Sequence, residues 1–274
     1  MGPKVLTAYG LEVSVWNVTF LVGVAIGYVV LEVACRLRLD GRRPAYLPFR
    51  WIISVYISTL GAQFFAYLFD LYTSALPPPS ISWMRYYLDP LFGPKTLYGA
   101  IVFMPLSVVA ISWPWKDLDF RAGLDCWTPP LFAVIGVARI GCFLYGCCYG
   151  IRWDRWGISF PPDSPVSDHH LKAGLIDFGM PSLPVVPTQL ISMLALLCIC
   201  VWTLWCLRKN RREIFPDAVA LYSIFRFGIE FVRDDPDRNF LGPFSSSQWI
   251  SLLLLAIYTT WRFTWANRSA RPDK

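Results

Sequence analysis

The sequence predicts an all-α, polytopic integral membrane protein, because apolar residues dominate it and recur in stretches long enough to cross a bilayer. Of the 274 residues, 55% are hydrophobic and only 16% are charged, and the mean hydropathy is +0.44. Soluble domains of this length carry more charge. A helix of about 20 apolar residues crosses the hydrocarbon core of a membrane. We therefore expect one transmembrane domain over residues 1–274.

About seven transmembrane helices are expected, with six or eight as alternatives. Arg139 interrupts the fourth apolar stretch, and the third and sixth stretches are short. The first lacks the cleavage site of a removable signal peptide, so we expect it to remain as a span. Between the fourth and fifth, the Pro, Asp and Trp content of about 151–186 predicts an ordered arm outside the membrane. The seven stretches are 12–34, 51–75, 97–113, 128–147, 187–207, 216–232 and 247–265.

Lysines and arginines are unequally divided between the two faces that these helices define. Short loops rich in these residues stay in the cytoplasm, so we expect the N-terminus outside and the C-terminus in the cytoplasm. The net charge of +6 suits contact with anionic lipid headgroups. No stripe of basic and aromatic residues indicates a nucleic-acid partner. Fifteen of the twenty-five basic residues fall on the predicted cytoplasmic face: Arg36, Arg38, Arg42, Arg43, Arg50, Lys116, Arg121, Arg208, Lys209, Arg211, Arg212, Arg262, Arg268, Arg271 and Lys274. Eight fall on the other face: Lys4, Arg85, Lys95, Arg152, Arg155, Lys172, Arg233 and Arg238.

Two arginines, Arg139 and Arg226, lie inside predicted spans at similar depth toward the outer leaflet. A charge at the centre of a membrane helix costs roughly 2.5–3.5 kcal/mol, so such residues normally face a bundle interior. In the string RFGIEFVRDD, Glu230 and Arg233 follow Arg226 at i+4 and i+7, which predicts one charged helical face. A structural ion pair is the alternative for Arg226. Arg139 has no carboxylate within a turn or two, so its expected partner is a phospholipid phosphate, which suits a planar guanidinium.

Further polar residues and glycines fall near the same predicted level. Simple capping or interfacial packing is the alternative reading for Asn17, Gln189 and Gln248. Small residues in membrane helices let the backbone bend or approach a neighbour closely. The set comprises Asn17, Tyr98, Gln189 and Gln248 at the outer helix ends, with Gly136, Gly141, Gly146 and Gly150 around Arg139.

Five separate stretches carry a resemblance to a known family: ARIGCFLYGCCYG (138–150), WGISFPP (156–162), PTQL (187–190), LYSIFRFGIEFVRDDP (221–236) and SSSQWISL (245–252). They resemble the prolipoprotein diacylglyceryl transferases of bacterial inner membranes. The likeness covers most of the chain from residue 97 onward, and several motifs in the same order are a specific signal.

This resemblance implies an activity, its partners and a set of site residues. The diacylglyceryl group of phosphatidylglycerol would pass to the lipobox cysteine of a prolipoprotein signal peptide, forming a thioether and releasing glycerol phosphate. Membrane lipids would surround the protein, the arm would be periplasmic, and no metal or other cofactor would be needed. The implied catalytic residues are Arg139, Arg226, Glu230 and Tyr98. The implied substrate-binding residues are Arg139, Arg226, Arg233, Gln189, Gln248, Gly141, Gly150 and Cys142.

The chain departs from the family pattern at several positions, which indicates a divergent branch with a Cys-Cys-Tyr-Gly signature. Cys142 and Cys147 replace an asparagine and a glutamate, and Tyr98 replaces a histidine. Glu230 is the best-placed carboxylate to act as a base, whereas Tyr98 is a poor base with a pKa of about 10. The departures around the glutamine motif are Val186, Ile191 and Ser192, and Trp16 stands near an expected tyrosine.

Two other classes of function remain as alternatives. A lipid transporter or a catalytically silent relative would bind phosphatidylglycerol without product. A metal or disulfide site would use Cys142, Cys147 and Cys148 with His169 and His170. Against this second class, the adjacent Cys147 and Cys148 would point to different sides of a helix.

Overall fold

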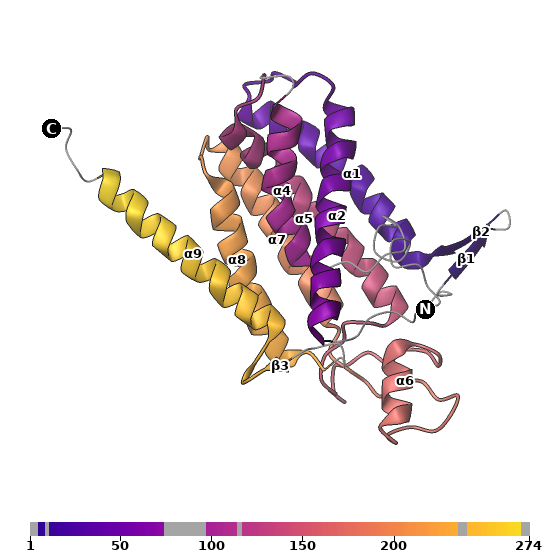
Figure 1. Cartoon of the computed structure of the whole chain (residues 1–274). Coiled ribbons are helices and arrows are strands. Elements are labelled where there is room, and N and C mark those ends of the chain that lie inside the picture. The colour runs from indigo at the N-terminus through magenta and orange to yellow at the C-terminus, as the bar shows by residue number, and fades with distance from the viewer. Residues whose placement is uncertain (1–4, 9–10, 74–96, 114–116, 235–239, 270–274) are drawn as a thin grey trace.

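The computed structural model describes residues 5–8, 11–73, 97–113, 117–234 and 240–269, and this part of the chain is mostly helical (Figure 1). The expected all-α class is confirmed, with two small antiparallel hairpins added. The long helices are α1 (Val15–Arg38), α2 (Leu47–Thr73), α4 (Leu97–Ser112), α5 (Phe120–Tyr145), α7 (Thr188–Arg208), α8 (Ile214–Ile229) and α9 (Ser246–Ser269), with a short α6 (Pro165–Lys172) and a 3-10 turn η1 (Glu230–Val232). The hairpins are β1 (Val5–Ala8) with β2 (Leu11–Ser14), and β3 (Phe240–Leu241) with β4 (Phe244–Ser245).

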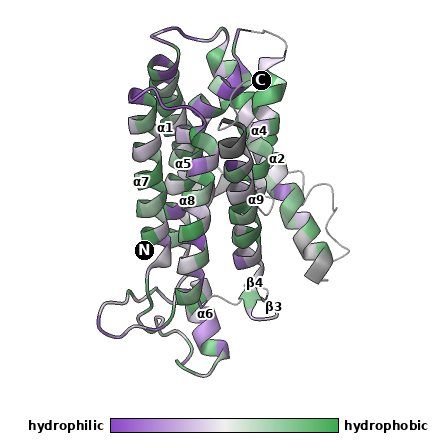
Figure 2. Cartoon of the chain, turned by 90° about the vertical axis from the view of Figure 1, so that its left-hand side faces the viewer, coloured by the Kyte–Doolittle hydropathy of each residue, from purple (hydrophilic) through white to green (hydrophobic). Residues whose placement is uncertain are grey.

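Four helices in the described part of the chain are long and apolar enough to cross a membrane. They are α1, residues 47–68 of α2, α5 and α7, and α4 is a shorter apolar helix. Figure 2 shows that hydrophobic residues predominate along α7. The protein is therefore a multi-pass membrane protein, whereas the count of seven spans stays a prediction.

Helix α5 is the centre of the bundle. It packs against α1 and α7 along its length, while α2 packs on α4 and α8 packs on α9. Trp127 and Phe132 of α5 are almost fully buried. Gly27 of α1 permits the close approach, because a Cβ atom there would lie 2.6 Å from Val134 of α5. Arg139 is therefore carried on the most enclosed helix of the bundle.

Ion pairs hold the helices together at the end of the bundle that the basic residues predict to be cytoplasmic. Arg38 of α1 lies 3.0 Å from Asp125 of α5, and the same carboxylate accepts a hydrogen bond of 2.9 Å from the backbone N–H of Ile214 in α8. Arg50 of α2 lies 2.6 Å from Asp117. These contacts set the relative positions of α1, α5 and α8 far from Arg139.

The limits of α5 differ from the expected stretch of 128–147. The helix begins at Phe120, because the Asp119 side chain accepts hydrogen bonds from the backbone N–H groups of the first turn. It ends at Tyr145, because Gly146 adopts a left-handed backbone with φ of 84°. The expectation that a helix separates Cys147 from Cys148 is therefore wrong, since both residues lie beyond the helix.

The expected arm at 151–186 is an ordered segment with the short helix α6 inside it. Buried Tyr149, Phe160, Val166 and Val185 form its small hydrophobic core. Isolated β-bridges join Val185 to residues 152 and 158. Figure 1 shows this segment projecting from the end of the bundle where β3 lies. Its placement outside the membrane stays a prediction.

Candidate active site

Arg139 lines a cavity of about 520 Å³ between α1, α2, α4 and α5. Most of its wall is apolar, with residues such as Phe20, Trp51 and Met104, and Asn17 adds one of a few polar groups. Within the described residues, the guanidinium makes its closest polar contact at 4.0 Å, from Arg139 Nη1 to Cys142 Sγ. No carboxylate within the described ranges forms an ion pair with Arg139. An arginine in this setting can bind the anionic group of a ligand.

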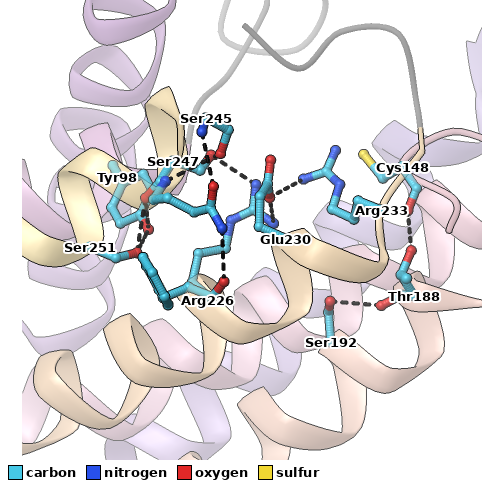
Figure 3. Close-up of polar contacts among 12 residues, drawn as sticks. Tyr98, Cys148, Thr188, Ser192, Arg226, Glu230, Arg233, Ser245, Ser247 and Ser251 are labelled. Carbon is cyan, nitrogen blue, oxygen red and sulfur yellow. Dashed lines mark hydrogen bonds and ion pairs between the residues drawn. The ribbon is translucent and has the colours of Figure 1, made fainter. Parts of the chain in front are cut away.

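A buried cluster of three charges lies where α8 ends (Figure 3). Glu230 Oε2 is 2.9 Å from Arg226 Nη1 and 3.6 Å from Arg233 Nη1. The Glu230 side chain is 2% exposed, and those of Arg226 and Arg233 are 12% and 11% exposed. Two guanidinium groups and one carboxylate leave one net positive charge. The predicted charged face is present, but Arg233 lies beyond η1 rather than on a continuous helix.

Tyr98 of α4 reaches α9 rather than a carboxylate. Its hydroxyl lies 2.6 Å from Ser251 Oγ and donates to the Ser247 carbonyl at 3.1 Å. Arg226 Nη2 donates to Ser247 Oγ at 2.9 Å, so one turn of α9 joins Tyr98 to the charged cluster (Figure 3). This arrangement makes Tyr98 a residue that positions α9 and Arg226.

Tyr222 connects the two groups of arginines, and the sequence reasoning missed it. It is 1% exposed and interacts electrostatically with Arg226, Arg139, Arg233 and Glu230. No residue in the described part of the chain hydrogen-bonds its hydroxyl. Tyr222 lies four residues before Arg226, so its place on the charged helical face was a signal available in the sequence.

The start of α7 holds the chain segment that follows α5. Gln189 Nε2 donates to the Cys147 carbonyl at 2.7 Å, and the Thr188 hydroxyl donates to the Cys148 carbonyl (Figure 3). Gln189 is 1% exposed. The amide thus organises the segment beside Arg139, and any contact of Gln189 with substrate stays a prediction.

Gly150 is the point where three segments meet. Its N–H donates to the Val186 carbonyl at 2.9 Å, and it forms a β-bridge with Arg233. A Cβ atom at Gly150 would lie 2.7 Å from the Val232 carbonyl oxygen. Glycine is therefore required for this approach, which sets the backbone position of Arg233. Gly141 instead faces α1, where a Cβ atom would lie 3.0 Å from Trp16 Cα.

Gln248 binds backbone groups at the start of α9. Its Oε1 accepts a hydrogen bond of 2.9 Å from the Ser245 N–H, and its Nε2 donates to the Phe227 carbonyl at 3.4 Å. The side chain is 2% exposed. These contacts fix the start of α9 against α8, as the capping alternative expects, and a direct contact with substrate stays a prediction.

Three thiols converge at the wall of the cavity. The Sγ atoms of Cys142, Cys147 and Cys148 all lie within 4.8 Å of one another, and within the described ranges no histidine joins this group.

The Tyr149 hydroxyl lies 2.7 Å from His169 Nδ1. His170 Nδ1 accepts from the Leu183 N–H at 3.2 Å, and burial, followed by His169, lowers the pKa of His170. The histidines therefore belong to the arm.

Comparison with known proteins agrees with this geometry. The sequence model of the prolipoprotein diacylglyceryl transferase family matches residues 3–264. The chain belongs to that family. The resemblance in the motifs is thereby confirmed, and the match extends over the residues before 97, where the motifs gave little signal.

Several members of the prolipoprotein diacylglyceryl transferase family are similar to this chain. Phosphatidylglycerol–prolipoprotein diacylglyceryl transferase 2 of Clostridium perfringens is 34% identical over 164 residues, which are 58% of this chain and 57% of the relative. The Clostridium tetani enzyme of the corresponding name is 26% identical over 94% of this chain and 95% of its own length. The Clostridium kluyveri enzyme is 22% identical over the full length of both chains. This chain therefore matches some relatives over their whole length and others over only part of it.

Proposed function

We propose that the protein transfers the diacylglyceryl group of phosphatidylglycerol to the lipobox cysteine thiol of prolipoprotein signal peptides. A thioether forms and glycerol phosphate leaves. The names of the similar proteins support both substrates. The observation that carries the proposal is Arg139, a guanidinium without a carboxylate partner within the described ranges, placed in an apolar cavity of about 520 Å³. A cavity of this size and character suits a lipid headgroup with part of its acyl chains.

The charges of the site favour a phosphate diester. Arg226 and Arg233 share Glu230, which leaves one positive charge, and Arg139 supplies a second. Phosphatidylglycerol carries one negative charge on its phosphate. Guanidinium groups bind phosphate oxygens in a planar, bidentate fashion, and the poorly hydrated cavity strengthens the attraction. The phosphate would bind Arg139 in the cavity, and Tyr222, which interacts electrostatically with Arg139, Arg226 and Arg233, would lie near it.

The transfer step needs a thiolate, a stabilised leaving group and the exclusion of water. The thiolate sulfur attacks the glycerol carbon next to the phosphate ester oxygen, so that a C–S bond forms and the C–O bond breaks. The phosphate leaves with the electron pair, and the arginines stabilise its developing charge. A free cysteine has a pKa of about 8.5, and a positive field favours its thiolate. The apolar cavity wall excludes water that would compete as the nucleophile.

The roles of the remaining groups follow from their contacts. Glu230 orients Arg226 and Arg233 through the two ion pairs, and it is also the carboxylate best placed to accept the thiol proton. Tyr98 positions α9 and, through Ser247, Arg226. Gln189 and Gly150 hold the segment between Arg139 and Arg233 in place. Gly141 allows α1 to close one side of the cavity, and Cys142 lies on its wall.

The cell location and orientation belong to the same proposal. The protein lies in the bacterial inner membrane as a multi-pass span, with its N-terminus and the arm at 151–186 in the periplasm and its C-terminus in the cytoplasm. The uneven distribution of basic residues supports this orientation. The active site then opens toward the side on which secreted prolipoproteins emerge.

A transfer assay tests the function. Purified protein in detergent or liposomes is incubated with phosphatidylglycerol and a lipobox peptide, and the peptide mass is measured. The proposal expects a diacylglyceryl mass on the cysteine and release of glycerol phosphate. If the protein binds the lipid and modifies no peptide under conditions that support a related enzyme, the lipid-binding or transport alternative replaces the transferase.

A further inference from the structure

The end of α5 carries a cluster of three thiols that the transfer reaction does not use. Cys142 lies in the last turn of α5, and Cys147 and Cys148 lie just beyond it. Their Sγ atoms lie within 4.8 Å of one another. Cys142 is buried and the other two are half-buried, and all three line the cavity that contains Arg139. We call these residues the thiol cluster.

The backbone after α5 is shaped so that the chain turns back on Cys142. The N–H groups of Gly146 and Cys147 both donate to the Cys142 carbonyl, at 2.9 and 3.2 Å. Cys148 then adopts a φ of 58°, which is uncommon for a residue with a side chain. The two hydrogen bonds from Gln189 and Thr188 hold the carbonyls of Cys147 and Cys148. The convergence of the thiols is therefore fixed by tertiary contacts.

The sulfur spacing suits coordination of one metal ion. A zinc–sulfur bond of about 2.3 Å in tetrahedral geometry places the sulfur atoms about 3.8 Å apart. The thiol cluster reaches this spacing if each side chain moves by less than about 1 Å. Thiolates are soft ligands that select zinc, copper(I) and related ions over magnesium or calcium.

The charges around the thiol cluster also favour a metal–thiolate complex. A divalent ion bound by three thiolates carries one net negative charge. Arg139 Nη1 lies 4.0 Å from Cys142 Sγ, and both Arg233 and Arg139 interact electrostatically with the Cys148 thiol. These guanidinium groups would balance the negative charge of the complex beside a mostly apolar cavity wall.

We propose that Cys142, Cys147 and Cys148 form a three-thiolate binding site for a thiophilic divalent metal ion, of which Zn²⁺ is the biological example. Three thiols each release a proton and donate an electron pair to the ion, and no oxidation occurs. The fourth coordination position faces the cavity. Neither the transfer reaction nor the family resemblance requires this site.

Occupancy of the site opposes lipid transfer, and this consequence rests on the proposed function. The negatively charged complex attracts the Arg139 guanidinium and competes with the lipid phosphate for it. Metal binding therefore lowers the transfer rate, and a chelator restores it. The thiol cluster makes the enzyme sensitive to thiophilic metal on the side where the cavity opens.

Metal titration of the full-length protein tests the site without reference to activity. The probe is Cd²⁺, followed by its ultraviolet sulfur-to-metal charge-transfer band in the presence of a phosphine reductant, with Zn²⁺ as competitor. We expect one ion for each chain. Loss of a residue that only hydrogen-bonds a metal ligand weakens metal binding about 10- to 100-fold. Loss of a ligand itself, in Cys148→Ala or Cys147→Ala, should therefore lower the metal affinity at least about 100-fold.

Two controls keep this experiment decisive. Cys198→Ala removes an exposed thiol of α7 outside the cluster and should leave the affinity unchanged. A protein with Ala at Cys35, Cys126, Cys198, Cys200 and Cys206 keeps only the cluster and should retain the full stoichiometry. If that protein does not fold, the single variants in the natural background decide. No tight Cd²⁺ or Zn²⁺ binding, or equal affinity in Cys148→Ala and the natural chain, overturns the proposal.

A separate measurement tests the effect of the metal on lipid transfer. Zn²⁺ should inhibit transfer by the natural protein, and each variant is compared with its own metal-free rate. Inhibition that persists unchanged in Cys148→Ala overturns the regulatory consequence. If the protein shows no transfer at all, the titration alone still decides whether the site binds metal.

Discussion

The carboxylate of Glu230 lies 2.9 Å from the guanidinium of Arg226, and both groups are buried at the end of α8. A buried charge without its partner is costly, so each group depends on the other. Because Arg226 also donates to Ser247 of α9, the pair links the charged cluster to the neighbouring helix. Glu230 is therefore first of all a residue that positions Arg226.

Glu230→Gln tests that role, since it keeps the shape of the side chain and removes its charge. Hydrogen bonds to charged groups contribute about 1.5–3 kcal/mol, so we expect transfer to fall about 10- to 100-fold. The pH profile of kcat/KM should keep its shape. Abolished turnover with a flattened profile would instead identify Glu230 as the general base.

Tyr222→Phe should lower transfer with little change in stability. The hydroxyl has no hydrogen-bond partner within the described part of the chain, so its removal costs the fold little. It lies within electrostatic reach of three arginines, where a substrate phosphate would accept its hydrogen bond. We expect kcat/KM to fall by about 5- to 15-fold, the equivalent of about 1–1.5 kcal/mol for one hydrogen bond.

Tyr98→Phe is the matched comparison for that substitution. It removes contacts to Ser251 and Ser247, so the thermal stability of the protein should fall as well as its activity. Equal stability losses in the two variants, measured by thermal unfolding in one detergent, would contradict the separation of a substrate-facing hydroxyl from a structural one.

Gly150→Ala should disrupt the contact that places Arg233. The added Cβ would lie 2.7 Å from the Val232 carbonyl oxygen and 2.8 Å from Thr188 Cγ2. Overpacking of this kind costs about 1–3 kcal/mol, so we expect lower thermal stability and lower transfer. Gly228→Ala in α8 is the control, because nothing lies within 4 Å of its Cβ position. Alanine there should be neutral or stabilising, and similar losses in both variants would refute the steric explanation.

Topology mapping tests the proposed orientation. Tags at the N-terminus and near Asp168 should react with a reagent that does not cross the membrane. Tags after Arg212 or at Lys274 should react only after the membrane is opened, because the basic residues favour the cytoplasm. An N-terminus protected from the outside would contradict both the orientation and the side on which the site opens.

The general features of this protein could be predicted from sequence because they depend on composition and local spacing. Long apolar runs predicted α1, α2, α5 and α7 as spans, and the i,i+4 spacing predicted the Arg226–Glu230 pair. No carboxylate lies near Arg139 in the sequence, and no carboxylate among the described residues forms an ion pair with it.

Features that depend on helix ends and tertiary contacts were missed. The apolar run through 147 concealed the end of α5 at Tyr145, where Gly146 turns the chain. The grouping of Cys142, Cys147 and Cys148 therefore stood only as an alternative, against which a longer helix was argued. The spacing could have placed Tyr222 on the charged face of α8, but its electrostatic interaction with Arg139 depends on the packing of α5 beside α8. Gln189 and Gln248 donate to the carbonyls of Cys147 and Phe227 in other segments of the chain, contacts that spacing alone cannot supply.

The most direct test of the central claim is the transfer rate of Arg139 variants. Arg139→Ala should lose on the order of 10²–10³ in kcat/KM, as expected for one electrostatic donor to a leaving group, and Arg139→Lys should recover little because it lacks the planar fork. Arg121→Ala on the same helix is the control, since its side chain is 73% exposed and pairs with Glu213 far from the cavity. A folded Arg139→Ala protein that modifies the lipobox peptide as fast as the Arg121→Ala protein would contradict the account.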